Sequence, residues 1–245
     1  MSERVALVTG STSGIGAATA RRLARDGYRV ALHGRRPESE VKALLGELNG
    51  ATYHPVDLGA VERVGTLVEQ VLACHGRLDV LVNNAGEAAR FPHADLKAAT
   101  PMVWHRMMDV NLVSPFMLIA AAEEALRRSA AAGRPACVVN IGSHAGERPK
   151  GSSIPYAAAK AGLHHTTRLL AHVLGPDIRV NCVAPGLVDT PMAIGYDTAF
   201  ELWNTRSPMR RPAKPEDIAD LVAALCASDY VTGEIVIADG GLNLT

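Results

Sequence analysis

The sequence has no excess of either charge and no long apolar run. Its 25 basic residues balance its 25 acidic residues, so the formal net charge is zero. A neutral chain has no overall field that draws it to nucleic acid or to an anionic membrane, so neither partner is expected. No run of about 18 apolar residues is present, and no membrane-spanning helix is predicted. The start, MSERVALVTG, lacks the apolar core and cleavage site of a signal peptide, so we expect a cytoplasmic protein.

Cysteine is scarce, and its spacing carries no metal or disulfide signal. The four cysteines form no CxxC pair, so neither a zinc site nor a disulfide framework is indicated. Nine histidines are present, but the adjacent His164 and His165 point to different sides of a helix. They cannot form the i, i+4 ligand pair of a zinc helix, and no metal site is predicted.

Short runs rich in β-branched residues recur along the chain, with helical patterns between them. These seven strand candidates are RVALVT, YRVALH, ATYHPV, LDVLVN, PACVVNIG, IRVNCV and EIVIADG. Several are continuously apolar, as strands buried on both faces of a parallel sheet must be. Gly27 stands where a left-handed helix end belongs, and Thr100 and Pro101 stand where a cap and a first helical residue belong. The sequence therefore predicts an α/β fold in which residues 1–245 form a single domain around a seven-stranded parallel sheet.

One long stretch, from Gly186 to about Pro215, contains no clear strand. Segments of this length between elements are usually lids or binding loops, so we predict a substrate lid at about 187–214. Its apolar side chains suit an apolar or long-chain substrate, or else pack the lid onto the body of the protein. They are Met192, Ile194, Tyr196, Phe200, Leu202, Trp203 and Met209.

Two short motifs indicate chemistry. The glycine-rich segment TGSTSGIG, Thr9 to Gly16, follows the first strand and opens into a helix. Its glycines allow a tight turn close to a pyrophosphate, and a helix N-terminus offers free N–H groups, so the segment predicts nucleotide binding. The segment YAAAK places Tyr156 and Lys160 at positions i and i+4 of a predicted helix, where both groups act on the same small volume.

Together with three other segments, these motifs resemble the short-chain dehydrogenase/reductase family. The other segments are NNAG at Asn83 to Gly86, the serine of NIGSHAG, and APG at Ala184 to Gly186. Ser143 precedes Tyr156 by 13 residues, the interval typical of the family's catalytic pair. The resemblance covers essentially the whole chain and implies a doubly wound, Rossmann-type fold with helices on both sheet faces. It also implies a homotetramer assembled through the helices near residues 101 to 131 and 155 to 174.

The resemblance assigns catalytic roles to four residues. It makes Tyr156 the general acid of carbonyl reduction, Ser143 the group that holds the substrate oxygen, and Asn111 the residue that holds a water in a proton relay. Lys160 grips the nicotinamide ribose. We also expect Lys160 to lower the pKa of the phenol, because one positive charge about 4 Å away supplies about 4 kcal/mol at an effective dielectric of about 20.

The resemblance also assigns the cofactor side. Gly34 stands where enzymes that use NAD carry an acidic residue, and Arg35 follows it. A guanidinium binds a 2′-phosphate that a carboxylate would repel, so NADP(H) is the preferred cofactor and NAD(H) a possible one. A Gly34→Asp, Arg35→Ile variant is predicted to move the preference toward NADH. The predicted cofactor-binding residues are Gly10, Ser11, Thr12, Ser13, Gly14, Ile15, Gly16, Arg35, Asp57, Leu58, Asn83, Ala85, Gly86, Tyr156, Lys160, Pro185, Gly186, Val188 and Thr190.

The substrate is less sharply indicated. Chain length, lid length and the YAAAKAGL segment look most like 3-oxoacyl-carrier-protein reductases, which implies a small-molecule or thioester substrate and an acyl carrier protein as a possible partner. His144, next to Ser143, is a candidate for the pocket wall, and Glu87, after NNAG, is a candidate for the active-site mouth. Two other functions stay open: an NAD(P)-dependent dehydrogenase of a small alcohol, sugar or polyol, and a non-enzymatic dinucleotide sensor on the same fold.

Overall fold

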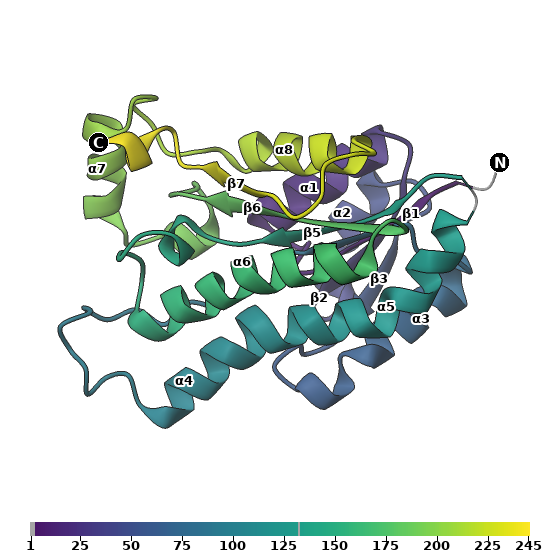
Figure 1. Ribbon diagram of the computed structural model, residues 1–245, viewed down its shortest axis with the longest axis horizontal. Helices are drawn as coiled ribbons and strands as arrows, with labels where there is room; N and C mark the ends of the chain where they lie inside the picture. Colours follow the sequence, from purple (N-terminus) through teal and green to yellow (C-terminus); the bar gives the residue numbers. More distant parts are fainter. Residues whose placement is uncertain (1–2, 132) are drawn as a thin grey trace.

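The computed structural model of the protein describes residues 3–131 and 133–245 and places all seven predicted strands in one parallel sheet (Figure 1). The strands are β1 (Val5–Val8), β2 (Arg29–Gly34), β3 (Thr52–Pro55), β4 (Val80–Asn83), β5 (Ala136–Ile141), β6 (Ile178–Pro185) and β7 (Ile235–Ala238). Their spatial order is β3-β2-β1-β4-β5-β6-β7, and every pairing is parallel. Strands β2 and β3 are added on one side of β1, and β4 to β7 on the other side. The strand order therefore changes direction between β1 and β4, and a ligand crevice is expected there at the carboxyl ends of the strands.

Helices cover both faces of this sheet, as the continuously apolar strands require. They are α1 (Gly14–Arg25), α2 (Lys42–Glu47), α3 (Gly65–His75), α4 (Pro101–Met108), α5 (Ser114–Ala130), α6 (Ile154–Leu174), α7 (Asp197–Arg206) and α8 (Pro215–Ala227). Figure 1 shows α1 and α8 on one side of the sheet and α3, α5 and α6 on the other. Short helical turns complete the set: η1 (Glu38–Glu40), η2 (Val61–Arg63), the π-turn η3 (Asp109–Val113), η4 (His144–Gly146), η5 (Pro191–Ala193) and η6 (Leu242–Leu244). Among the described residues, no helix has the length and apolar character needed to cross a membrane.

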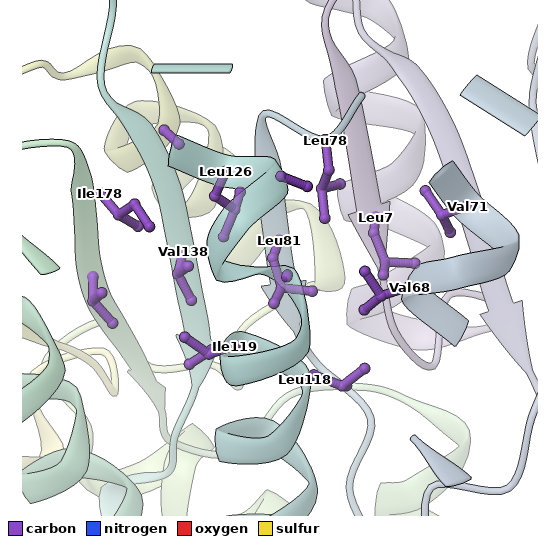
Figure 2. Close-up of a cluster of buried hydrophobic side chains, with 14 of the residues drawn as sticks. Leu7, Val68, Val71, Leu78, Leu81, Leu118, Ile119, Leu126, Val138 and Ile178 are labelled. Carbon is purple, nitrogen blue, oxygen red and sulfur yellow. The ribbon is translucent and has the colours of Figure 1, made fainter. Parts of the chain in front are cut away.

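Each face of the sheet has its own apolar cluster. Figure 2 shows the cluster under α3 and α5, in which Leu7, Leu81 and Val138 of the strands meet Leu118 and other helix side chains. The second cluster packs α1, α2 and α8 against the opposite face. Burial of one such leucine stabilises the fold by roughly 1.5–3 kcal/mol, so the two clusters hold the strand ends in fixed positions.

The predicted helix signals are confirmed. The Thr100 hydroxyl accepts a hydrogen bond from the Val103 N–H and Pro101 opens α4, whereas Gly27 follows α1 with φ +88°. The predicted lid contains one element that the sequence analysis did not place, the helix α7. Its bounding segments pair with each other through a bridge between Val188 and Ala213, so the lid is closed at its base.

Candidate active site

A cavity of about 770 Å³ opens at the carboxyl ends of the strands and runs from the glycine-rich segment to the lid. All four predicted catalytic residues line it. Most predicted cofactor-binding residues line it as well: Gly10, Thr12, Ser13, Gly14, Ile15, Arg35, Asp57, Leu58, Ala85, Gly86, Tyr156, Lys160, Pro185, Gly186, Val188 and Thr190. Their roles stay predictions, but tertiary structure brings them to one surface.

Three predicted cofactor residues, Ser11, Gly16 and Asn83, lie behind the cavity wall instead of in it. The Ser11 hydroxyl accepts a hydrogen bond from a backbone N–H of β2, which ties the glycine-rich segment to that strand. A Cβ at Gly16 would lie 2.3 Å from the Gly10 carbonyl oxygen, so Gly16 permits close packing of α1. The Asn83 amide donates to Asn140 Oδ1 at 2.9 Å in the sheet interior. These three residues shape the cavity from behind.

The glycine-rich segment is held by two side chains from neighbouring strands. His33 of β2 accepts the Gly10 N–H at its Nδ1 (3.0 Å), and its Nε2 lies 2.9 Å from the Val56 carbonyl oxygen. Because Nδ1 accepts, Nε2 carries the proton and donates to Val56. Burial lowers the pKa of His33 to about 4, so the ring is neutral at physiological pH. Asn84, after β4, donates to the carbonyl oxygens of Thr9 and Gly10.

This segment fits a dinucleotide. Gly10 has φ +62°, and a Cβ there would lie 2.9 Å from the Ala85 Cα. Only glycine therefore fits at this position, and the backbone is not covered by a side chain. The helix α1 begins at Gly14 without a side-chain cap, which leaves its first N–H groups and its positive dipole end available to a pyrophosphate. The cavity that these groups line also reaches Tyr156 and Lys160.

Ser143, Tyr156 and Lys160 meet where β5 ends and α6 begins. Ser143 follows β5 and its hydroxyl accepts the Ala145 N–H at 3.2 Å, which caps η4. Ser153 caps α6 by accepting the Tyr156 N–H, so Tyr156 stands in the first turn of that helix and Lys160 one turn later. The predicted i, i+4 placement on one helix is confirmed.

The electrostatics of this pair differ from the prediction. The Lys160 Nζ lies 5.9 Å from the centre of the Tyr156 ring and donates to the Ile141 carbonyl oxygen at 2.8 Å. Burial raises the pKa of the Tyr156 phenol, and its hydrogen bond with Ser143 lowers that pKa only in part. Burial also lowers the pKa of Lys160 to about 8. Desolvation, which the sequence argument left out, is therefore the main influence on both pKa values.

Asn111 lies in the π-turn η3, between α4 and α5, and is fully buried. Such turns interrupt the regular helix and are frequent at functional sites. The Asn111 amide donates to the Glu87 carbonyl oxygen at 3.0 Å, and its oxygen accepts the Glu87 N–H at 3.3 Å. A Cβ at Gly86 would lie 2.9 Å from Asn111 Oδ1 and 3.6 Å from Lys160 Nζ, so the glycine lets these two side chains approach.

The candidate Glu87 lines the cavity. Its carboxylate pairs with Arg106 of α4, with 2.7 Å from Arg106 Nε to Oε2, and with Arg35, with 2.8 Å from Nη1 to Oε1. The pKa of Glu87 is lowered, mainly by its hydrogen bonds with Arg106. The spacing of Arg35 and Glu87 in the sequence, 52 residues, hides this contact from any local pattern.

Gly34 imposes a limit on the cofactor test suggested by the sequence. A Cβ at Gly34 would lie 2.7 Å from Thr12 Cγ2 and 2.9 Å from the Tyr53 hydroxyl. An aspartate at this position would displace both side chains. Substitution of Arg35 alone, which is exposed at the end of β2, is the cleaner test.

Residues of the segment predicted as a lid line the cavity together with Ser143 and Tyr156. Trp203 of α7 is buried and donates its Nε1–H to the Asp239 carbonyl oxygen at 3.2 Å. Arg90 fastens the other part of the lid: it donates to the carbonyl oxygens of Met192 and Ile194 and stacks at 4.2 Å on the Tyr196 ring. Trp203 thus packs on the body and also lines the cavity, whereas Met192, Ile194 and Met209 are exposed, so the two alternatives for the lid side chains both stay open.

Two histidines have structural roles that sequence reasoning did not assign. His144 lines the cavity as predicted, and its ring also meets Trp203 edge to face at 6.4 Å. His164 accepts the Ser143 N–H at Nε2 (3.4 Å), and its Nδ1 lies 2.9 Å from a Glu147 oxygen. His164 lies four residues after Lys160 on the same helix face, and this spacing was the feature of the sequence that could have placed it near Ser143. Within the described residues no cluster of three potential metal ligands is present.

Comparison with known proteins shows what the chain is related to. A family model described as enoyl-(acyl carrier protein) reductase matches residues 10–243. A putative ketoacyl reductase of granaticin polyketide synthesis from Streptomyces violaceoruber is 43% identical over 98% of this chain and 96% of its own length. The cis-4-hydroxycyclohexanecarboxylate dehydrogenase of Sinomonas cyclohexanicum is 38% identical, with 98% and 96% covered.

Solved structures agree with these relatives. A putative short-chain dehydrogenase/reductase from Burkholderia xenovorans superposes with a TM-score of 0.92 at 35% identity, covering all of both chains. The 3-ketoacyl-(acyl-carrier-protein) reductase of Brucella melitensis, solved with NADH, gives a TM-score of 0.88 at 30% identity, with 98% of each chain covered. With the glycine-rich segment, Ser143, Tyr156 and Lys160 on one cavity of this fold, the chain belongs to the short-chain dehydrogenase/reductase family of NAD(P)-dependent oxidoreductases.

Proposed function

We propose that the protein is an NADPH-dependent ketone reductase that converts a 3-oxoacyl thioester, or a similar carbonyl compound, to the secondary alcohol. The observation that carries this proposal is the convergence of Ser143, Tyr156 and Lys160 on the cavity that the glycine-rich segment also lines. The relationship to a ketoacyl reductase of polyketide synthesis supports the direction of the reaction and the substrate class.

The chain's own residues supply the acid chemistry. When bound, the reduced nicotinamide supplies a hydride to the carbonyl carbon. The electron pair of the C=O π bond passes to oxygen, and the Tyr156 phenol donates the proton that completes the alcohol. Burial raises the pKa of this phenol, so the proton stays on Tyr156 until the substrate oxygen becomes basic as the hydride arrives. The Ser143 hydroxyl hydrogen-bonds the same oxygen and orients it toward Tyr156.

Lys160 and Asn111 assist Tyr156 in its role as the acid. Lys160 is buried, and its ammonium has two N–H donors besides the one that the Ile141 carbonyl accepts. These donors hold the nicotinamide ribose and return a proton to Tyr156. Asn111, in its π-turn, donates to the Glu87 carbonyl oxygen beside Lys160, and it holds a water in the proton relay to Lys160.

The preference for NADP(H) rests on Arg35. Its guanidinium is exposed at the end of β2, lines the cavity, and follows a glycine that carries no carboxylate. A guanidinium there binds a 2′-phosphate through charge-assisted hydrogen bonds. Arg35→Gln is expected to weaken NADPH binding about tenfold and to change NADH binding less than about twofold.

Partner proposals follow from the surface. An acyl carrier protein is proposed to deliver the thioester, because Lys150 lies exposed at the cavity and has no ion-pair partner among the described residues. A homotetramer is proposed through α5 and α6, which leave large apolar side chains in solvent. These side chains are Phe116, Met117, Leu169 and Val173. Sedimentation that shows only a monomer at micromolar concentration would refute the assembly.

A second function is oxidation of a small alcohol, sugar or polyol with NAD(P). Sequence similarity to a hydroxycyclohexanecarboxylate dehydrogenase favours it. The test of both is a rate measurement on purified protein, with NADPH or NADH and a short 3-oxoacyl thioester, beside the reverse reaction with cyclic alcohols and polyols. Fast consumption of NADPH with the thioester, lost in Tyr156→Phe, supports the proposal. Turnover of alcohols alone would replace it with the second function. Binding of nucleotide without any turnover would favour a dinucleotide sensor.

A further inference from the structure

The Glu87 carboxylate is held between two arginines on the cofactor side of the cavity. Arg106 binds it in a bidentate manner, from Nε to Oε2 at 2.7 Å and from Nη2 to Oε1 at 2.5 Å. Arg35 reaches the same Oε1 with its Nη1 at 2.8 Å. One carboxylate oxygen thus serves both guanidinium groups.

The position of this carboxylate is fixed independently of Arg35. Arg106 packs against Gly59, where a Cβ would lie only 1.7 Å from its Nη1, and its Nη2 is 3.9 Å from an Asp57 oxygen. Asn111 holds the Glu87 backbone on both sides through its side-chain amide. The Glu87 side chain is 26% exposed, whereas that of Arg35 is 61% exposed, so Arg35 is the more solvent-accessible member of the pair.

The charge of this cluster is balanced. Arg35 and Arg106 carry two positive charges, and Glu87 and Asp57 carry two negative charges. Hydrogen bonds from Arg106 keep the pKa of Glu87 below its usual range, so the carboxylate is ionised at neutral pH. A 2′-phosphate that approaches Arg35 therefore meets a guanidinium already engaged by a carboxylate, and that carboxylate repels it.

We propose that Glu87 sets the balance between the two dinucleotides by competing with the 2′-phosphate of NADP(H) for Arg35. This inference rests on the proposed role of Arg35 as the 2′-phosphate ligand. NAD(H) has a neutral hydroxyl at the same position, so the competition costs it nothing. Glu87 thereby lowers the discrimination that a free arginine would give and lets NAD(H) bind as well.

Binding measurements on Glu87→Gln test this without any ketone. Titration calorimetry is expected to show NADPH binding about tenfold tighter than in the wild type, because one repelling charge is removed. NADH binding is expected to change less than about twofold. Circular dichroism and thermal melting check that the isosteric variant folds. An equal change for both nucleotides, or no change for either, would overturn the inference and leave Glu87 as a structural partner of Arg106.

A double-mutant cycle identifies the arginine concerned. In an Arg35→Gln background, Glu87→Gln is expected to leave NADPH affinity within about twofold. Persistence of the tenfold gain there would assign the phosphate to another cation, such as the freed Arg106, and overturn the competition with Arg35. Glu47→Gln is the matched control. Glu47 pairs with Arg21 at 2.7 Å, and neither residue lines the cavity. It must leave the ratio of the two affinities unchanged.

The outcome is separable from that of the proposed function. If no ketone is reduced, the ratio of NADPH affinity to NADH affinity still shows whether Glu87 competes for Arg35. If the wild type prefers NADH, the proposed NADPH dependence is wrong, but the shift produced by Glu87→Gln still supports or overturns the competition.

Discussion

Protonation of His33 is expected to destabilise the protein in mild acid. The ring is buried between the glycine-rich segment and β3, and its pKa falls from 6.5 to about 4. Above pH 6.5 the ring is neutral in the folded and the unfolded chain. Below it the unfolded chain takes up the proton first, so the free energy of unfolding falls until the pH reaches about 4.

The pKa difference sets the size of this loss. At about 1.36 kcal/mol per pH unit, the full effect is about 3 kcal/mol, of which about 2 kcal/mol is lost by about pH 5. The structure gives the local cause. Burial of the ring is the main cause, and a proton on Nδ1 would also remove the acceptor of the Gly10 N–H.

Denaturant unfolding between about pH 7.5 and pH 5, in wild type and His33→Asn, measures the effect. The asparagine oxygen replaces Nδ1 as the acceptor for Gly10 but cannot reach Val56, so the variant loses about 1 kcal/mol at every pH. Its decline toward pH 5 is expected to be smaller than that of the wild type by about 2 kcal/mol. Other histidines with lowered pKa values, His54, His75 and His164, are present in both proteins, so their contributions cancel in the comparison.

Parallel curves for the two proteins would refute this reasoning, because they would show that His33 does not titrate differently in the folded chain. The exposed His165→Asn controls for the loss of one imidazole from the sequence.

Three further predictions concern the site. Tyr156→Phe should slow single-turnover reduction by about a hundredfold to ten-thousandfold, with nucleotide affinity within about threefold by calorimetry; near-normal turnover would remove the phenol from the mechanism. Arg90→Leu removes the hydrogen bonds and ring contact that fasten the lid, so limited proteolysis should cut within residues 187–214 severalfold faster; unchanged cleavage would mean that α7 alone closes the lid. His164→Leu leaves the Ser143 N–H unpaired and should lower the free energy of unfolding by about 1–3 kcal/mol, which His164→Gln should partly restore; equal losses in both variants would contradict the hydrogen bond.

The elements were predictable because their signals are local. Continuously apolar runs of a few residues specify strands buried on both faces, and all seven were found where the sequence placed them. The cap at Thr100 and the left-handed glycine at Gly27 depend only on neighbouring residues, and both are confirmed. The helix α7 was missed because the lid sequence mixes polar and apolar residues without a clear period.

Contacts between distant residues were not predictable in the same way. His33 and Gly10 are 23 residues apart, and Arg35 and Glu87 are 52 apart. Each pair meets only because the parallel sheet brings the carboxyl ends of its strands to one edge. The pKa argument for Tyr156 and Lys160 counted only the attraction between two groups, whereas burial by the surrounding chain raises the pKa of the phenol and lowers that of the lysine.

The sequence by itself therefore determined the strands, the glycine-rich turn and the Tyr156–Lys160 spacing, because each depends on a few consecutive residues and the fixed geometry of helix or strand. Only the tertiary structure decided which charges face one another, how far desolvation moves each pKa, and that Glu87 engages the arginine assigned to the cofactor. Those properties depend on distance and dielectric environment, and both are set by packing between segments that lie far apart in the chain.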